Sequence, residues 1–295
     1  MNRRKILFVI NRKSGSSDNT DIENTLAKGL ESSLIRYEFH FLTGDDDSRH
    51  IKELIKSFKP DIVCAAGGDG TINLVASIIM NRPLTLGIIP IGSANGLAVE
   101  LGIPENPEEA INLLLSGSAR PMDVVQINAD HICLHLSDVG INARIVSEFE
   151  KEGKRGFVGY FKHFFRELTR PQKSFKCEIL INNRLYIHRS YMTVIANASK
   201  YRTGANLNPE GKIDDGIFEI VIFKPYHRWI WRSLFGAFTG TMHKQPNVET
   251  YECTAAQITI KPAQDLQVDG ESLGITSFFK ANIHKHALNI ILPSL

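Results

Sequence analysis

The segment Gly67-Gly68-Asp69-Gly70-Thr71 has the residue types needed to hold a phosphate group. It follows the apolar run Ile62–Ala66 and precedes the apolar pattern Ile72–Met80, so it should join a buried strand to a helix. Glycine lets the backbone approach a ligand closely, and a helix N-terminus suits an anion. An acid within such a turn is explained if Mg²⁺ accompanies the phosphate, with Asp69 near the metal. The alternative is a tight strand–helix turn in which Asp69 is a helix cap.

Two further loops follow predicted strands in the same part of the chain. Pro90–Ala98 repeats the arrangement one βα unit later and could form the opposite wall of a nucleotide cleft, although Gly-Ser-Asn turns are also common loops. Asn11–Gly15 follows the strand predicted at Lys5–Ile10, and Lys13 could meet a phosphate. The alternative for this loop is a solvated surface turn.

Two acidic turns lie late in the chain. Val268-Asp269-Gly270-Glu271 contains Asp-Gly, a strong turn signal. It predicts either an ordinary hairpin with an exposed Glu271, or a carboxylate held on a turn to take a proton from a substrate hydroxyl. The adjacent acids of Lys212–Gly216 could bind a cation or be solvated.

The elements that must position these loops fall into two parts. Before Met122, strands alternate with helices, which predicts an open α/β sheet whose ligands bind at the carboxyl ends of the strands. After Met122, strands dominate and predict a mainly antiparallel β domain, with helix-like stretches near Gly156–Leu168 and Arg228–Phe238. The expected domains are residues 1–122, rejoined by a C-terminal strand at 285–295, and residues 123–284.

The composition excludes several classes of protein. The net charge of +2 gives no global field that would gather nucleic acid. The four cysteines form no Cys-x-x-Cys pair, which argues against a zinc or dithiol site. The sequence contains no run of about 18 consecutive apolar residues, so no transmembrane helix is expected. We therefore expect a cytoplasmic protein that would reach a lipid only from the inner membrane surface.

Taken together, the ordered segments resemble the diacylglycerol kinase catalytic-domain superfamily, which includes bacterial lipid kinases and the sphingosine and ceramide kinases. Gly67–Thr71 matches the Gly-Gly-Asp-Gly-Thr motif of that superfamily, and Pro90–Ala98 resembles its Pro-x-Gly-Thr/Ser-x-Asn turn. Asn11–Gly15 resembles the first nucleotide loop of the superfamily, and Met122–Val124 resembles its entry to the second domain. Pro209–Gly216 and Val268–Glu271 resemble its later motifs.

The resemblance implies an α/β nucleotide domain and a β-sandwich domain with the active site in the cleft between them. It implies ATP and Mg²⁺ as cofactors, Asp69 near the metal and Glu271 as the general base. Lys212, Asp215 and Ile217 would form a structural Mg²⁺ site, the first and last through backbone oxygens. The residues expected to bind ATP are Asn11, Lys13, Ser14, Gly15, Thr43, Gly67, Gly68, Asp69, Gly70, Thr71, Asn73, Gly92, Ser93 and Asn95.

The acceptor is expected to be a lipid such as diacylglycerol or a sphingoid base. Many bacterial members have Asn-Asp where this chain has Asn95-Gly96, which is more similar to the version in sphingosine and ceramide kinases. Basic and aromatic residues mix in Lys151–Arg170 and Lys224–Lys244, which could lie on a membrane or pack against the β domain. The alternatives are a soluble-substrate kinase of the NAD-kinase type and a non-catalytic lipid-binding protein. A homodimer is one alternative for the oligomeric state.

Overall fold

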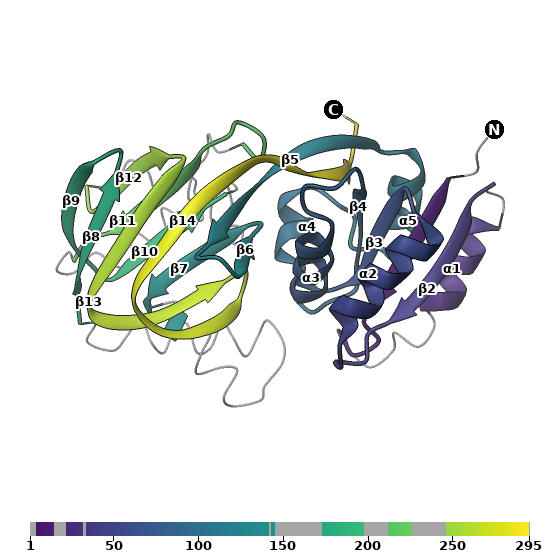
Figure 1. Cartoon of the computed structure of the whole chain (residues 1–295), viewed down its shortest axis with the longest axis horizontal. Helices are drawn as coiled ribbons and strands as arrows, with labels where there is room; N and C mark the ends of the chain where they lie inside the picture. The colour runs from purple at the N-terminus through teal and green to yellow at the C-terminus, as the bar shows by residue number, and fades with distance from the viewer. Residues whose placement is uncertain are drawn as a thin grey trace. The chain divides into compact units, whose positions relative to one another are not determined.

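A computed structural model of the chain describes residues 4–14, 22–31, 34–141, 143–144, 173–197, 212–225 and 246–294. The chain forms two compact units (Figure 1). The first contains Met1–Met122 and His286–Leu295, and the second contains Asp123–Lys285. The helix-like stretches expected at 156–168 and 228–238 lie outside the described residues.

The first unit is built on a parallel sheet. Its strands are β1 (Lys5–Ile10), β2 (Arg36–Phe41), β3 (Ile62–Gly67) and β4 (Thr85–Pro90), in the order β4-β3-β1-β2. The end of β14 (Glu271–Leu292) extends this sheet, because Asn289 and Ile290 pair in parallel with Thr85 and Leu86 of β4. Parallel strands covered on both faces are apolar throughout, as the buried runs in β1, β3 and β4 are.

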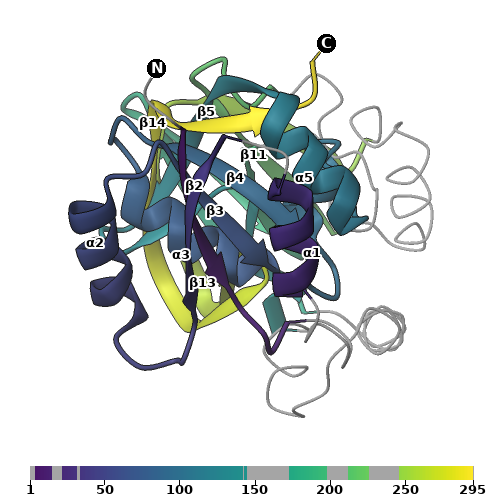
Figure 2. The same ribbon diagram turned by 90° about the vertical axis from the view of Figure 1, so that its right-hand side faces the viewer.

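Helices cover both faces of this sheet (Figure 2). On one face, α1 (Ile22–Leu30) packs beside α5 (Pro107–Ser116). On the other, α2 (Asp47–Phe58) packs beside α3 (Asp69–Ile79). The short helix α4 (Gly96–Glu100) follows β4 and precedes α5. These layers place the loops after β1, β2, β3 and β4 at one edge of the sheet, where α/β proteins bind ligands.

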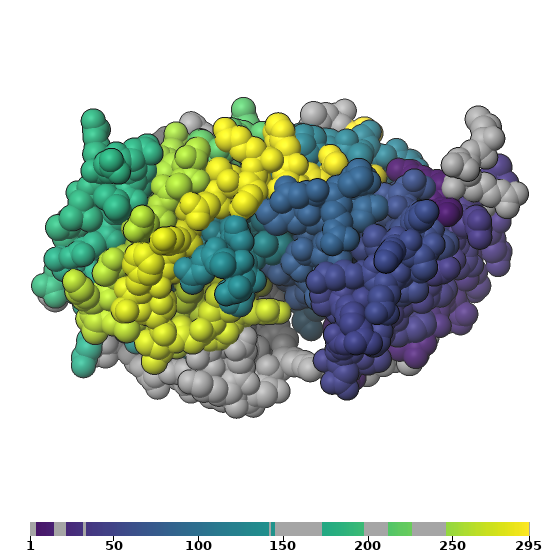
Figure 3. Space-filling view, in the orientation of Figure 1, coloured from purple at the N-terminus to yellow at the C-terminus, as the bar shows by residue number. Residues whose placement is uncertain are grey.

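The second unit consists of antiparallel strands. Their bounds are β5 (Ser118–Ile127), which begins in the first unit, β6 (His131–Cys133), β7 (Leu136–Gly140), β8 (Phe175–Ile181), β9 (Arg184–Ser190), β10 (Met192–Ala196), β11 (Phe218–Phe223), β12 (Val248–Cys253), β13 (Ala255–Val268) and β14. One layer has the order β12-β11-β10-β7, and a second contains the hairpin β8–β9. Figure 3 shows the β8–β9 hairpin in teal at the surface of this unit.

Strand β13 belongs to both layers of the second unit. Residues Gln257–Lys261 pair with β8, whereas Leu266–Val268 pair with β7, and the register with β14 shifts between Thr259 and Gln264. The inward residues of both layers form one buried core that includes Phe175, Cys177, Ile179, Phe218, Ile220, Ile258, Ile260 and Phe279. The second unit is therefore a β-sandwich.

The predicted elements agree with the observed ones in part. The alternating pattern of Phe175–Ile181 followed by Asn182-Asn183 predicts a hairpin. The structure has this hairpin, and both asparagines have positive φ, 49° and 60°. The sequence predicts a short strand at Gln257–Ile260, but the observed strand β13 is much longer and continues past Pro262 to Val268. Strand β12, helix α4 and the full length of β14 were not predicted. Helix α3 begins at Asp69 rather than Ile72, so the glycine segment provides its first turn.

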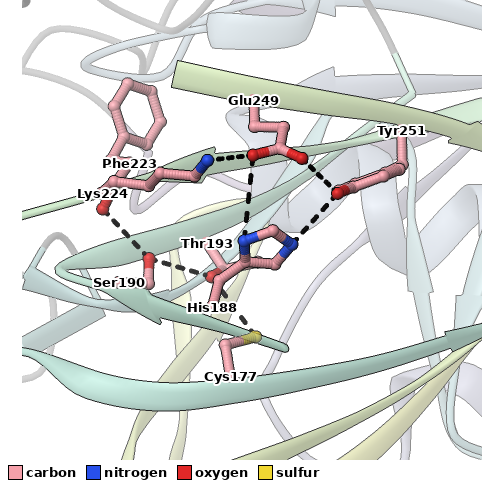
Figure 4. Close-up of polar contacts among 8 residues, drawn as sticks. All are labelled: Cys177, His188, Ser190, Thr193, Phe223, Lys224, Glu249 and Tyr251. Atoms are coloured by element: carbon pink, nitrogen blue, oxygen red, sulfur yellow. Dashed lines mark hydrogen bonds and ion pairs between the residues drawn. The ribbon is translucent and has the colours of Figure 1, made fainter. Parts of the chain in front are cut away.

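Edge strands β9 and β12 meet through a polar network (Figure 4). The His188 Nε2 atom lies 3.1 Å from the Tyr251 hydroxyl, and His188 Nδ1 lies 3.8 Å from a Glu249 carboxylate oxygen. Tyr251 donates to Glu249, which also pairs with Lys224. Burial lowers the pKa of His188; Glu249 opposes this shift and Lys224 adds to it. The network thus links the two layers with a neutral imidazole.

Stability should fall as the pH drops through the range where His188 would gain a proton. Its folded pKa is below the ordinary 6.5, so the unfolded chain binds the proton first and gains population as the pH falls below 6.5. His40 in the first unit has the same direction of shift. Denaturant titrations at pH values of about 7.5 and 5.5 should show a smaller pH dependence in His188→Gln than in the wild type. The exposed His131→Gln is the control, and an equal pH dependence in all three proteins would contradict the expectation.

Candidate active site

The glycine segment joins β3 to α3. Gly67 ends β3, and the Gly68 carbonyl accepts hydrogen bonds from the Thr71 and Ile72 amides at 3.0 and 3.1 Å, which starts the helix. Asp69, Gly70 and Thr71 therefore lie in the first turn of α3, where the helix dipole favours an anion. A Cβ atom on Gly67 would lie 2.2 Å from the Thr71 hydroxyl oxygen, so only glycine fits beside that side chain.

The loop after β1 lies against this turn. The Asn11 amide donates to the Ala66 carbonyl at 2.9 Å, and the Asn11 side-chain amide lies 3.4 Å from the hydroxyl oxygen of the buried Thr71. The Asn11 side-chain oxygen accepts from the Lys13 amide at 3.0 Å, and its carbonyl accepts from the Ser14 amide at 3.1 Å. The structure therefore brings this loop and the glycine segment together. Gly15 lies outside the described residues.

The turn after β4 is held in shape by Asn95. This buried residue has a φ of 48°, a left-handed conformation that asparagine tolerates well. Its side chain accepts from the Gly92 amide at 2.9 Å and donates to the Gly92 carbonyl at 3.0 Å. Ser93, between them, is exposed. Asn95 thus shapes the turn, and Ser93 is the member of this turn that presents a polar side chain to solvent.

The two glycine turns touch through their backbones. A Cβ atom on Gly92 would lie 2.5 Å from the Gly68 Cα atom and 2.8 Å from the Asn95 side-chain oxygen. A Cβ atom on Gly68 would lie 3.3 Å from the Gly92 Cα atom, a much milder contact. The sequence predicts Pro90–Ala98 as a wall opposite the first turn, and the structure brings the backbones of the two turns into direct contact.

Replacing Gly92 with alanine should push the two turns apart. Because the new methyl group would meet backbone atoms, we expect a loss of about 1–3 kcal/mol in the free energy of unfolding, together with weaker binding of the predicted nucleotide. Gly68→Ala is the matched control and should cost clearly less stability. Thermal unfolding and nucleotide titration calorimetry would measure both effects. Equal stability losses in the two variants would contradict the predicted contact.

The Asp69 carboxylate connects the first glycine turn to α4. Its two oxygens accept hydrogen bonds from the Gly96 and Leu97 amides at 3.0 and 3.1 Å. These amides belong to the first turn of α4, so Asp69 caps a helix other than its own. Gly96 is buried at this contact and uses its backbone amide there.

Thr43 and Asn73 have different surroundings. The Thr43 amide and hydroxyl lie 3.0 and 3.2 Å from Asp47, whose carboxylate also accepts from the Gly44 amide. Burial tends to raise the pKa of Asp47, but these hydrogen bonds hold it below its usual value. Thr43 thus helps to begin α2, and in the described hydrogen bonds it does not contact the glycine turns. Asn73 is half-buried within α3.

In the second unit, the predicted acidic turn is a tight hairpin between β13 and β14. Asp269 and Gly270 have φ values of 48° and 90°, which fit a type I′ turn. The Asp269 carboxylate accepts from the Leu134, His135 and Leu136 amides at 2.8, 2.9 and 3.1 Å. Burial raises the pKa of Asp269, whereas these amides favour its charged form. Asp269 therefore fixes the turn from which Glu271 projects.

Glu271 is exposed at the start of β14 and pairs across the turn with Val268. The turn is further fixed by Gln267, whose side-chain oxygen accepts from the Gly270 amide at 2.7 Å. Gln267 is buried and also donates to Asp138, which is buried as well. Glu271 is thus a solvent-exposed carboxylate on an ordered turn.

The loop Lys212–Gly216 lies next to Asp123, a buried acid that was not predicted as a site residue. Asp123 is fully buried; its carboxylate accepts from the Gly216 amide at 2.5 Å, and its amide donates to the Ile213 carbonyl at 2.7 Å. Asp215 is exposed, and its side chain accepts from the Ile217 amide at 3.1 Å. The signal for Asp123 was an acid within the apolar strand Met122–Val125.

The donor groups suit Mg²⁺ only with help from a ligand. Among the described residues, no three His, Cys, Asp or Glu side chains gather as a metal cluster. Mg²⁺ is often held by one or two carboxylates together with waters and substrate phosphates, so Asp69 alone fits that pattern. Each Asp69 oxygen accepts one hydrogen bond from a backbone amide and retains capacity for a further contact.

In the described part of the chain, no helix is long and apolar enough to cross a membrane.

Comparison with known proteins agrees with this arrangement. Residues 5–127 match the family model "Diacylglycerol kinase catalytic domain", and residues 138–292 match "YegS C-terminal NAD kinase beta sandwich-like domain". The "Probable lipid kinase YegS-like" protein of Enterobacter sp. (strain 638) is 30% identical, covering 97% of this chain and 95% of its own. A protein of the same description from Yersinia pseudotuberculosis serotype I (strain IP32953) is 27% identical, and the match covers 97% of this chain and 96% of that protein.

Solved structures share the fold. A crystal structure of a diacylglycerol kinase from Bacillus anthracis str. Sterne has a TM-score of 0.76 at 21% identity, covering 99% of this chain and 98% of that one. Another structure from that organism, of a "putative diacylglycerol kinase", has a TM-score of 0.81 at 21% identity, and the match covers 98% of this chain and 95% of that one. The predicted fold class, an α/β domain with a β-sandwich domain, is confirmed.

The fold and the family matches identify a kinase with a diacylglycerol kinase catalytic domain. The chain belongs to the YegS-like lipid kinase family, and the predicted family resemblance is confirmed.

Proposed function

We propose that this protein is an ATP- and Mg²⁺-dependent lipid kinase that transfers the γ-phosphate to a hydroxyl of a lipid such as diacylglycerol or a sphingoid base. The observation that carries the proposal is the backbone contact between Gly68 and Gly92, reinforced by the link from Asp69 to α4. This contact makes one glycine surface at the carboxyl edge of a parallel sheet, where α/β proteins bind ligands and where a helix N-terminus suits a phosphate.

In this proposal the first unit, extending through residue 122 with the returning C-terminal strand, binds ATP. The backbone of Gly67–Asn73, together with the loop containing Asn11, Lys13, Ser14 and Gly15, contacts the phosphates. Thr43, Gly92, Ser93 and Asn95 complete the nucleotide site. The second unit, from residue 123 through 284, receives the lipid.

The chemistry requires positioning and charge neutralisation more than covalent catalysis. The first turn of α3 orients the phosphate chain, with its dipole opposing the negative charge. Asp69 would hold Mg²⁺, which would offset negative charge on the phosphates. Glu271 accepts the proton of the acceptor hydroxyl as the hydroxyl oxygen bonds to phosphorus and ADP leaves.

A second Mg²⁺ in this proposal is structural. It would be held by the Asp215 carboxylate and by backbone oxygens of Lys212 and Ile217. Its support is the ordered turn around Asp123, which fixes Gly216 and Ile213 on either side of Asp215. This metal would stabilise the loop and take no part in phosphate transfer.

Incubating the protein with ATP, Mg²⁺ and a lipid extract tests the proposal. Mass spectrometry should find a lipid species that gains one phosphate. A parallel incubation with NAD addresses the soluble-substrate alternative, which gains support from the match of residues 138–292 to an NAD kinase-like sandwich. Phosphorylated NAD with unchanged lipids would favour that alternative, and absence of ATP–Mg²⁺ binding would favour a non-catalytic lipid-binding protein.

We further propose that the protein is cytoplasmic and peripheral at the inner membrane surface, where its substrate resides. For the two basic and aromatic stretches at 151–170 and 224–244, membrane contact was one alternative and packing against the β domain the other, and both stretches lie largely outside the described residues. The homodimer likewise stays a prediction, which sedimentation of the purified protein would test.

A further inference from the structure

One outer face of the β-sandwich carries side chains that the proposed reaction does not use. It is formed by β9, β8, β13 and the part of β14 that pairs with β13, whose colours adjoin on the surface in Figure 3. Alternate residues of these strands enter the core, so the residues between them point outward. We call these outward residues the outer face.

The strand register arranges the outer face in three rows. The first row is Leu185, Leu180, Gln257 and Lys280; the second is Ile187, Glu178, Thr259 and Phe278; the third is Arg189, Lys176 and Lys261. Side chains within a row are direct cross-strand neighbours. Two rows therefore bring apolar groups to the surface, and the third consists of cations.

The apolar members are unusually open to solvent. Leu185 is 58% exposed, Ile187 53% and Phe278 43%. Leu185 and Ile187 are next to each other on the same side of the edge strand β9, and Leu180 lies directly opposite Leu185. Exposed apolar side chains gathered beside polar ones commonly mark an interaction surface.

The third row is electrostatically unfavourable without an anionic partner. Arg189, Lys176 and Lys261 lie directly opposite one another on neighbouring strands, and like charges in such positions are destabilising. Glu178 offsets part of this charge, because it accepts a hydrogen bond from Lys176 at 2.6 Å. That hydrogen bond, together with the charges of Lys176 and Lys261, lowers the pKa of Glu178. With Lys280, the outer face holds four cations and one carboxylate.

We propose that the outer face docks on the surface of an anionic lipid bilayer. Leu185, Ile187 and Phe278 would enter the headgroup region while the lysines and Arg189 meet anionic headgroups, the combination that holds peripheral proteins on membranes. A second copy of the chain fits poorly, because a two-fold contact would oppose two faces of the same net charge. The inference rests on the proposed function, since a lipid kinase must reach a substrate held in a bilayer.

Vesicle sedimentation without ATP tests the docking separately from catalysis. Wild-type protein should bind vesicles of phosphatidylcholine with about 30% phosphatidylglycerol more tightly than phosphatidylcholine alone. The variants Lys261→Gln/Lys280→Gln and Leu185→Thr/Ile187→Thr should each lose about tenfold or more in partitioning. The matched controls are Lys52→Gln/Lys56→Gln on α2 and the exposed Leu34→Thr, which should bind as the wild type does.

Kinase assays then distinguish a failed docking site from a failed function. The face variants should phosphorylate a short-chain, monomeric lipid at the wild-type rate but a vesicle-embedded lipid much more slowly. Vesicle binding equal in the face variants and the wild type would overturn the docking proposal. So would a wild-type dimer that these variants dissociate, since the face would then be a protein interface. Normal vesicle binding without phosphorylation of any lipid would instead overturn the proposed function.

Discussion

Replacing Glu271 with alanine is expected to lower kcat by about 10²–10⁴-fold while ATP binding is retained, as for loss of a positioned base. The expectation depends on the hairpin that presents this carboxylate. Asp269 and Gln267 fix the turn through backbone amides, so the Glu271 side chain starts from an ordered backbone. Because the residue is exposed, the substitution should leave the fold intact.

Steady-state kinetics with the lipid acceptor and calorimetric titration with ATP measure the two halves of this prediction. Glu271→Gln keeps the shape but lacks a basic carboxylate, so it should be nearly as slow as the alanine variant. Glu252→Gln, an exposed glutamate on β12 of the same unit, should retain the wild-type rate. Near-normal turnover by Glu271→Ala would remove this residue from the proposed role.

Replacing Asp69 with alanine is expected to disrupt both glycine turns. The variant loses both acceptors for the Gly96 and Leu97 amides, which should lower the free energy of unfolding by about 1–3 kcal/mol. If Asp69 also acts near Mg²⁺, activity should fall by at least about 10²-fold, beyond what the structural loss explains. Thermal unfolding and kinetics at saturating ATP would record the two effects.

The asparagine variant separates the two roles of Asp69. Asp69→Asn retains one oxygen to accept an amide but loses the negative charge. A variant with most of its stability and little activity would support a role at the metal, whereas recovery of both would show that Asp69 is only a cap. Asp61→Ala is the control, because Asp61 accepts the Lys5 amide at 2.7 Å elsewhere in the same unit. Its activity should be unaffected.

The local parts of the first unit were predictable from sequence. Apolar runs such as Ile62–Ala66 are continuous because their strands are buried on both faces, and the stripe of Ile51, Leu54, Ile55 and Phe58 has helical spacing. Each of these patterns lies within about a dozen residues, so it can be recognised without knowing the fold. The same locality explains the correct hairpin at Asn182-Asn183.

The contacts that organise the candidate site could not be predicted this way. Asp69 and Gly96 are 27 residues apart, and Asp269 and Leu134 are 135 apart. Sequence reasoning offered a helix cap as one alternative for Asp69, but it could not identify α4 as the helix. Likewise, the close approach of Gly68 and Gly92 depends on the pairing of β3 with β4. Such facts follow from tertiary structure alone.

The return of β14 to the first unit has a consequence for how the protein is made. Ala287 accepts a hydrogen bond from the Asn81 amide, Asn289 and Ile290 pair with β4, and Ile291 enters the core of that unit. A ribosome adds about 5–20 residues per second, so these residues emerge on the order of ten seconds after Met122. Until then, strand β4 of the nascent first unit lacks its β14 neighbour and is an edge strand. The second unit is synthesised before that edge is covered.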